Sequence, residues 1–375
     1  MLVFGSLSLL GLVAIWIGYP LAVRVLAMLR PAMAPSGNTL PDAGTAVSVI
    51  IASHDEAGPI NARIDDVLRS HFPPERIEVI VALDSARARA TVEGLSRVDP
   101  RVTFLIGDAP GGKASSLNAA VRRARHEILV FTDTAQQFEP EAIGELVRMF
   151  GDPRTGAVSG MLELGRSGRL LNVAERYWLY ERWLRRWEAR LHSTVGVTGA
   201  VYAMRRSLWE DLPAGLILDD LYGPMRLVLQ GWRVAFTERA LAHDARRFAA
   251  ADEYRRKVRT LTGVIQTTVW LGGVLNPLRN PIWLQYVFHK LLRLLTPYLT
   301  ISVIVAAAWV LIRNIVSTPH GLLVLSSVVT AGVLICLIPR VRRMVSAQLA
   351  WGFALQSSIV VATINGVRGK WNVWN

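Results

Sequence analysis

Carboxylate residues follow three short runs of apolar and β-branched residues, each with the length of a β-strand. These runs and the carboxylates behind them are 47–52 with Asp55 and Glu56, 77–83 with Asp84, and 127–131 with Asp133. The segments between the runs have helical length and pattern, so we expect a parallel sheet, whose ligands bind beyond the carboxyl ends of the strands. The carboxylates predict a site for a polar ligand with hydroxyl groups or for a metal held by oxygen atoms. Each alone is equally consistent with a helix cap.

A glycine turn and a lysine precede another helical segment. The sequence from Gly111 to Asn118 reads GGKASSLN, so Lys113 falls in the first turn of the expected helix. Backbone N–H groups and a cation at a helix start favour an anionic ligand such as a phosphate. An ordinary helix start with a solvated lysine fits the sequence equally well. A P-loop is excluded, because its spacing of glycine and lysine is absent.

Strands and helices that would position these residues alternate along the middle of the chain, which predicts an α/β fold with a mostly parallel sheet. Four stretches outside this part contain no charged residue, namely 1–23, 294–312, 314–339 and 344–367. About 20 helical residues cross the hydrocarbon layer of a bilayer, so each stretch is long enough to span it. The composition therefore argues against a simple cytosolic enzyme.

The apolar stretches divide the chain into predicted parts. We expect an N-terminal transmembrane helix at 1–29, a linker at 30–46, an α/β domain at 47–259, interfacial helices at 260–295, and a C-terminal transmembrane region of two or three helices at 296–375. The first apolar run lacks a basic start and a clear cleavage site, so we expect an uncleaved span.

Basic residues gather at the ends of the apolar stretches, and the net charge is 42 − 29 = +13. The flanking basic residues are Arg24, Arg30, Lys290, Arg293, Arg340, Arg342 and Arg343. Lysine and arginine remain on the cytoplasmic side of membranes, so we expect a multi-pass protein of the cytoplasmic membrane with its α/β domain in the cytoplasm. Basic and aromatic residues are not interleaved as in single-strand binders, so nucleic acid is not an expected partner.

Two segments, 169–190 and 261–295, combine tryptophan or tyrosine with basic residues. Aromatic rings and long basic side chains are favoured at the bilayer surface. An amphipathic helix packed on the α/β domain has the same pattern, and the sequence leaves both interpretations open.

Seven motifs occur in a fixed order: Asp55-Glu56, Asp84, Gly112-Lys113 with Asn118, Phe131-Thr132-Asp133, Thr198-Gly199-Ala200, Asp219-Asp220 and Arg256-x-x-Arg259. This order resembles that of the membrane-bound family-2 glycosyltransferases, the inverting group that includes cellulose, hyaluronan and chitin-oligosaccharide synthases. The resemblance implies a GT-A fold that binds a nucleotide-sugar donor, with membrane-spanning and interfacial α-helices.

The resemblance also implies which residues bind the donor. Glu56 and Asp84 would hold the uracil and ribose of a UDP-sugar, and Lys113 would lie near the nucleotide. Asp133 matches the first residue of the D-x-D motif, which holds Mg²⁺ or Mn²⁺ on the diphosphate. Arg256 and Arg259 match the Q-x-x-R-W segment that covers the diphosphate.

The acceptor side is assigned in the same way. Asp220 matches the catalytic base, and inverting transfer does need a carboxylate to deprotonate the acceptor hydroxyl. The residues placed around the acceptor are Thr198, Gly199, Ala200 and Asp219. The acceptor would be a growing polysaccharide or a membrane lipid.

Three positions depart from the family pattern. Ala135 stands at the second carboxylate of D-x-D, Arg256 at the leading glutamine, and Thr260 at the tryptophan of Q-x-x-R-W. Metal binding would then depend on Asp133 and the donor phosphates, and processive polymerisation is put in question. A non-processive transferase acting on a polyprenyl phosphate, and an inactive membrane scaffold, are the alternatives. A partner protein or an oligomer for export is left open.

Overall fold

The computed structural model describes residues 1–30, 44–85, 95, 99–165, 173–246, 250–317, 320–323, 325–327, 330 and 337–373. The chain forms two compact units, which we describe separately. The sheet unit comprises Val23–Phe248, Gln266–Tyr286 and Trp371–Asn375. The helical unit comprises Met1–Ala22, Ala249–Ile265 and Val287–Lys370. Most of the predicted linker, residues 31–43, lies outside the described residues.

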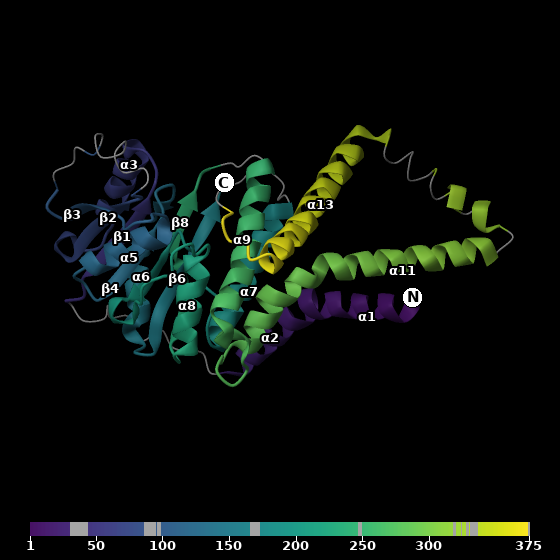
Figure 1. Ribbon diagram of the computed structural model, residues 1–375, viewed down its shortest axis with the longest axis horizontal. Coiled ribbons are helices and arrows are strands. Elements are labelled where there is room, and N and C mark those ends of the chain that lie inside the picture. The colour runs from purple at the N-terminus through teal and green to yellow at the C-terminus, as the bar shows by residue number, and fades with distance from the viewer. Residues whose placement is uncertain are drawn as a thin grey trace. The chain divides into compact units, whose positions relative to one another are not determined.

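The sheet unit is built on one sheet whose eight described strands have the order β3-β2-β1-β4-β7-β6-β8-β5 (Figure 1). The strands are β1 (Val47–Ser53), β2 (Ile77–Leu83), β3 (Val102–Ile106), β4 (Ile128–Thr132), β5 (Gln137–Phe138), β6 (Thr155–Leu164), β7 (Tyr202–Arg205) and β8 (Arg233–Asp244). The pairs β1–β2, β1–β4, β2–β3 and β6–β8 are parallel. Strand β7 runs antiparallel to β4 and β6, and β5 antiparallel to β8. The predicted mixed α/β fold is confirmed, and its parallel part is the half that contains the three predicted strands.

Those three strands lie close to their predicted positions because each is a short buried apolar run. The strand at 77–83 matches its prediction, β1 extends one residue further to Ser53, and β4 is shifted by one residue to 128–132. All residues of β2 and β4 are buried, as expected for central strands covered on both faces.

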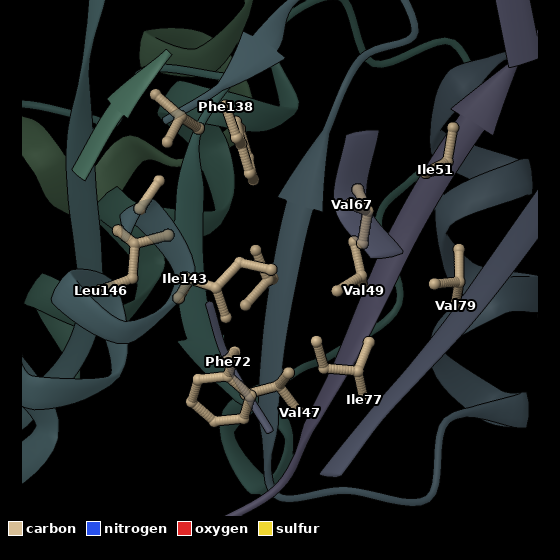
Figure 2. Close-up of a cluster of buried hydrophobic side chains, with 14 of the residues drawn as sticks. Val47, Val49, Ile51, Val67, Phe72, Ile77, Val79, Phe138, Ile143 and Leu146 are labelled. Atoms are coloured by element: carbon tan, nitrogen blue, oxygen red, sulfur yellow. The ribbon is translucent and has the colours of Figure 1, made fainter. Parts of the chain in front are cut away.

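Figure 2 shows the core on one face of this sheet, where Val47, Val49 and Ile51 of β1 point to one side. Alternate residues of a strand share a face, so this spacing selects one layer. Helices α3 (Ala57–Leu68) and α6 (Ala142–Arg148) contribute apolar residues to the same core, among them Val67 and Ile143. Helix α5 (Lys113–Arg123) contacts β1 and β2 and contributes nothing to this cluster, so it covers the opposite face.

The remaining helices of the sheet unit are α7 (Val173–Leu191), α8 (Asp219–Leu229), α10 (Trp283–Tyr286) and short turns at Pro74–Arg76, Met149–Gly151, Arg206–Leu208 and Gly272–Leu275. Helix α7 occupies most of the aromatic segment predicted at 169–190. Its residue Trp187 lies under the guanidinium of Arg24, 5.7 Å from ring centroid to Cζ. Arg24 belongs to α2 (Tyr19–Leu29), so the end of the N-terminal helix is held against α7.

The helical unit contains α1 (Leu2–Val13), a π-helical turn (Ala14–Gly18), α11 (Thr296–Ser317), α13 (Pro339–Val367), most of α9 (Ala250–Trp270) and two turns (Val287–Leu291, Leu292–Leu295). Helices α1 and α11 lie side by side (Figure 1). A Cβ on Gly5 would lie 2.3 Å from Cβ of Ala306, so glycine permits this close approach. Farther along the same pair, Nε1 of Trp16 donates to Oγ1 of Thr296 at 3.2 Å.

Three helical stretches in the described residues are long and apolar enough to cross a membrane: Leu2–Leu29, Trp283–Ile315 and Gln348–Val367. Their outward residues are large and apolar, as Phe4, Ile304 and Phe353 illustrate with exposures of 70%, 60% and 76%. These features support membrane association. The further span expected within 314–339 includes residues that the structure does not describe, namely 318–319, 324, 328–329 and 331–336.

Candidate functional site

The parallel strands bring the predicted carboxylates to one edge of the sheet. In the register, Ser53 of β1 pairs with Leu83 of β2, and Ile51 with Thr132 of β4. Asp84 and Asp133 directly follow their strands, and Asp55 lies two residues beyond β1. Oγ1 of Thr134 donates a hydrogen bond to Oδ2 of Asp55, which ties the loop after β4 to the end of β1. Glu56 is exposed at the start of α3.

Lys113 lies between two of the predicted carboxylates. Its Nζ is 3.1 Å from Oδ1 of Asp133 and 3.4 Å from Oδ2 of Asp219. The side chain of Asp133 is 41% exposed, whereas that of Asp219 is only 10% exposed. Lys113 therefore contacts both a solvent-exposed carboxylate at the carboxyl end of β4 and a largely buried carboxylate at the start of α8.

The electrostatics of this cluster keep Lys113 charged. Burial disfavours the ammonium, but the carboxylates of Asp133, Asp219 and Asp220 outweigh that effect and raise its pKa above the ordinary value. Burial, reinforced by the same three carboxylates, also raises the pKa of Tyr202 well above 10. Lys113 is therefore an ammonium and Tyr202 a neutral phenol at physiological pH.

The glycine turn before Lys113 reaches the second strand. Gly111 and Gly112 have φ of 98° and 89°, a region that favours glycine, and they deliver the chain to the start of α5. The backbone N–H of Gly112 donates to Oδ1 of Asp84 at 3.2 Å. Asn118, by contrast, exchanges two hydrogen bonds of 2.9 Å with the backbone of Leu212, so its amide anchors a loop.

The segment 196–200 lies against the start of α8. The N–H of Val197 donates to the backbone oxygen of Asp220 at 2.8 Å. A Cβ on Gly199 would lie 3.1 Å from Oδ2 of Asp220, so a glycine lets the segment approach that carboxylate closely. Asp220 is thereby placed beside Gly199.

Two residues of this segment, Thr198 and Ala200, are buried rather than exposed at its surface. Oγ1 of Thr198 donates to the backbone oxygen of Gly160 at 3.1 Å and accepts from Nη1 of Arg185 at 2.7 Å. Arg185 also donates to Oγ of Ser159 at 3.2 Å. The hydrogen bonds of the Thr198 hydroxyl and of Arg185 therefore attach the segment to β6. Sequence reasoning missed Arg185, because an arginine in an amphipathic helix gives no signal of an inward position.

Arg256 and Arg259 lie on α9 within the helical unit, whereas the other predicted site residues belong to the sheet unit. Arg256 is exposed and Arg259 is half-buried.

The described residues contain no cluster of three or more metal-ligating side chains. Asp133 is the carboxylate that follows β4, and the next position of its motif is the half-buried Ala135. Gln136 does not replace the missing carboxylate, because its side chain is buried and its Nε2 donates to Oδ2 of Asp244 at 2.9 Å.

Comparisons with known proteins identify the family and the fold. The family described as "Glycosyltransferase like family 2" matches residues 43–263. The chain is similar to the probable glycosyltransferase YdaM of Bacillus subtilis (strain 168), 24% identical over 212 residues, which are 53% of this chain and 50% of that protein. It is also similar to an N-acetylglucosaminyltransferase of Rhizobium sp. (strain N33), 27% identical over 191 residues, which are 48% of this chain and 42% of that protein. The chain thus spans about half the length of the curated relatives it matches.

A solved structure resembles nearly the whole chain. The mannosyltransferase PcManGT from Pyrobaculum calidifontis, in complex with GDP-Man and Mn²⁺, aligns with a TM-score of 0.69 and 20% identity. The alignment covers 98% of this chain and 99% of that one. At this identity the similarity shows the fold alone, and it confirms the predicted GT-A-like fold.

Proposed function

This chain belongs to glycosyltransferase-like family 2, and we propose that it transfers a sugar, with inversion, from a nucleotide-sugar donor to an acceptor hydroxyl. The observation that carries the proposal is the cluster in which Lys113 contacts Asp133 and Asp219, with Asp220 beside Gly199. It combines a cation for the diphosphate with a carboxylate for the acceptor at one edge of the sheet.

In the proposed reaction Asp220 takes the proton of the acceptor hydroxyl as the hydroxyl oxygen attacks the anomeric carbon. The new carbon–oxygen bond forms as the bond from the anomeric carbon to the phosphate oxygen breaks. Both electrons of the broken bond leave with the nucleoside diphosphate. Lys113 stabilises the charge that the diphosphate gains, because a fixed cation costs no reorganisation at that moment.

A divalent ion fits this site on the donor's side. Mg²⁺ is held in proteins by one or two carboxylates, with substrate phosphates and waters completing its octahedral shell. Asp133 supplies one such carboxylate, and its 41% exposure lets an ion reach it. When bound, Mg²⁺ or Mn²⁺ would neutralise charge on the leaving diphosphate. The similar mannosyltransferase was solved with GDP-Man and Mn²⁺, which supports a metal-bound sugar nucleotide as the donor.

The finer assignments come from the motif resemblance. Glu56 and Asp84 would bind the base and ribose, with a UDP-sugar as the expected donor, and Arg256 and Arg259 would cover the diphosphate. The contact of Asp84 with the N–H of Gly112 supports a role beside the glycine turn. Thr198, Gly199, Ala200 and Asp219 would shape the acceptor side, with Gly199 nearest to the base and Thr198 and Ala200 beneath it.

The acceptor would be a growing polysaccharide or a membrane lipid at the cytoplasmic face of the membrane. Three helical stretches with the length and composition of membrane spans support a membrane-embedded acceptor. Thr260, at the place of the family's tryptophan, favours transfer of a single sugar to a lipid such as a polyprenyl phosphate over processive synthesis. The product made in a membrane assay distinguishes these two acceptors.

A donor screen tests the proposed function. The full chain, purified in detergent, is given UDP- and GDP-sugars with Mn²⁺ and membrane lipid extract, and release of nucleoside diphosphate is measured. We expect one sugar nucleotide to be consumed, with release depending on Asp220. If the protein binds and consumes none of them, the transferase proposal is wrong and an inactive scaffold is the better description.

A further inference from the structure

The end of β8 is fastened to the loop that begins at Asp133. Strand β5 pairs with β8 in antiparallel register, with Gln137 opposite His243. One step closer to Asp133, Nε2 of Gln136 donates to Oδ2 of Asp244 at 2.9 Å. Both side chains are buried, with 3% of Gln136 and 1% of Asp244 exposed. A buried, hydrogen-bonded pair of this kind fixes the two segments against each other.

Arg246 is held at a set position just beyond this pair. Its backbone N–H and its Nε both lie 3.0 Å from Oδ1 of Asp244, and its Nη2 lies 2.8 Å from Oδ2. Two parallel bonds from a guanidinium to one carboxylate fix the plane of the guanidinium as well as its place. The side chain is nevertheless 47% exposed. Arg246 is therefore a positioned cation that a solute can reach.

The charge of Arg246 lies within electrostatic range of the site carboxylates. Its pairing with Asp244 outweighs burial, and Asp133 and Asp55 add to it, so the pKa of Arg246 is raised. Lys113 approaches Asp133 from α5, whereas Arg246 lies two residues beyond the end of β8. Two cations on different elements thus accompany one carboxylate, in a loop where Ala135 contributes no charge.

We propose that Arg246 binds the diphosphate of the donor together with Lys113, and supplies positive charge that a metal held by two carboxylates would otherwise provide. This inference rests on the proposed function. A guanidinium matches pairs of phosphate oxygens in a plane, which an ammonium cannot do. Asp244 and Gln136 are positioning residues for Arg246, because they hold it at the loop without reaching the donor themselves.

Binding of UDP and GDP in a chelator tests the proposal without relying on activity. The full chain in detergent is titrated calorimetrically with each nucleotide in EDTA, and again with Mn²⁺. We expect wild type to bind at least one nucleotide in EDTA and Arg246→Gln to bind it about tenfold more weakly or worse, the effect of losing charged hydrogen bonds. Arg246→Lys should regain part of the loss, because a point charge remains. Added Mn²⁺ should narrow the difference between the variants.

A matched control separates this effect from a general loss of positive charge. Arg148 on α6 is 44% exposed and ion-paired with Glu145, and Arg148→Gln should bind within about twofold of wild type. If Arg246→Gln spoils folding, seen in its melting curve, Arg246→Lys carries the comparison. Equal affinity of wild type and the Arg246 variants in EDTA, or no binding by wild type there, overturns the proposal. If the protein gives either of these results in EDTA but still binds a nucleotide with Mn²⁺, only the Arg246 proposal is wrong. If it binds neither UDP nor GDP with Mn²⁺, the Arg246 proposal and the proposed function are both wrong.

Discussion

Lys113 contacts the carboxylate to which a metal would bind, so the ammonium and a divalent ion compete for Asp133. Its raised pKa means that the lysine does not lose its charge to make room. A donor diphosphate changes this balance, because it offers Lys113 another anionic partner and offers the ion phosphate oxygens. Metal and donor should therefore bind interdependently, with negligible metal affinity before the donor arrives.

Replacing the lysine should reveal this competition. In Lys113→Met, Asp133 and Asp219 lose the ammonium that contacts both of them, so we expect nucleotide-free Mn²⁺ affinity to rise about tenfold or more, for which about 1.4 kcal/mol suffices. Ala135→Asp should also raise it, by adding a ligand. Calorimetric titration of Mn²⁺ into wild type, Lys113→Met and Lys113→Arg measures the effect, with the arginine variant expected to behave like wild type. No gain in the methionine variant would show that Lys113 does not oppose the metal.

Segment 196–200 is packed so tightly on the start of α8 that only a residue without a side chain at position 199 leaves Asp220 in its place. A Cβ there lies 3.1 Å from Oδ2 and 3.3 Å from Cβ of the aspartate. The position of Asp220 at the start of α8 thus depends on a glycine in a separate segment of the chain.

Gly199→Ala should move the carboxylate by a fraction of an ångström and lower kcat about ten- to hundredfold, since misplacement by about 1 Å can cost about 10²-fold. Donor affinity should change little. Gly144→Ala is the matched control, because nothing lies within 4 Å of the added Cβ in α6 and helix propensity improves. Steady-state rates and nucleotide titrations of both variants measure the effect, and unchanged kcat in Gly199→Ala would contradict the tight packing.

At the opposite edge of the sheet, Glu78 links β1, β2 and the end of α5. Its carboxylate is 6% exposed, accepts from the backbone N–H of Arg125 at 2.7 Å and from Ser48. Burial opposes the ionised form, but the bonds from Ser48 and Arg125 lower the pKa of Glu78 below 4.5. A lowered pKa stabilises the fold above the unfolded-state pKa, and this contribution disappears as pH falls through the folded-state value.

Glu78→Gln should therefore lower the free energy of unfolding of the sheet unit by about 1.5–3 kcal/mol at pH 7. The difference from wild type should shrink as pH falls below 4.5, because protonated glutamate and glutamine then resemble each other. Melting temperatures of the full chain in detergent, measured across this pH range, test the expectation. Glu75→Gln, at a side chain that is 71% exposed, should show no such trend. A stability difference between wild type and Glu78→Gln that does not change with pH would contradict a stabilising role for the charge of Glu78.

Sequence alone could predict the elements that are fixed by local patterns. The three buried strands and their trailing carboxylates are such elements, since apolar runs and parallel pairing bring Asp84 and Asp133 to one edge. Contacts that depend on tertiary packing were not predictable. The bond of Arg185 to Thr198 brings an arginine of an amphipathic helix under a predicted site segment, and the bond of Arg246 to Asp244 joins residues whose types suggest only a solvated surface. The inward turn of the Thr198 hydroxyl likewise depends on β6 beneath it.

At the scale of the whole molecule, we expect the basic flanks of the apolar stretches to set which side of the membrane the sheet unit faces. Arg24 and Arg30 follow the first candidate span, Leu2–Leu29. Lysine and arginine tend to stay in the cytoplasm, so we expect the residues after these arginines to be cytoplasmic and Met1 to lie outside. The proposed donors are sugar nucleotides, so the proposed function requires this orientation.

A reporter of membrane sidedness inserted at Gly44 should therefore read cytoplasmic in cells. The matched fusion at Met1 should read extracytoplasmic, because one span separates the two positions. An extracytoplasmic signal at Gly44 would contradict the orientation and, with it, access of the site to cytoplasmic sugar nucleotides.

In the proposed reaction Asp220 deprotonates the acceptor while the rest of the site binds the donor. The most direct test measures transfer and donor affinity together in Asp220→Asn, with Asp211→Asn as control, since Asp211 is 59% exposed and pairs with Arg122 away from the cluster. General-base catalysis contributes about 10²–10⁴-fold, so transfer by Asp220→Asn should fall by about that factor while its donor dissociation constant stays within about threefold of wild type. Transfer by Asp220→Asn within a few fold of the wild-type rate would contradict the assignment of Asp220 as the general base.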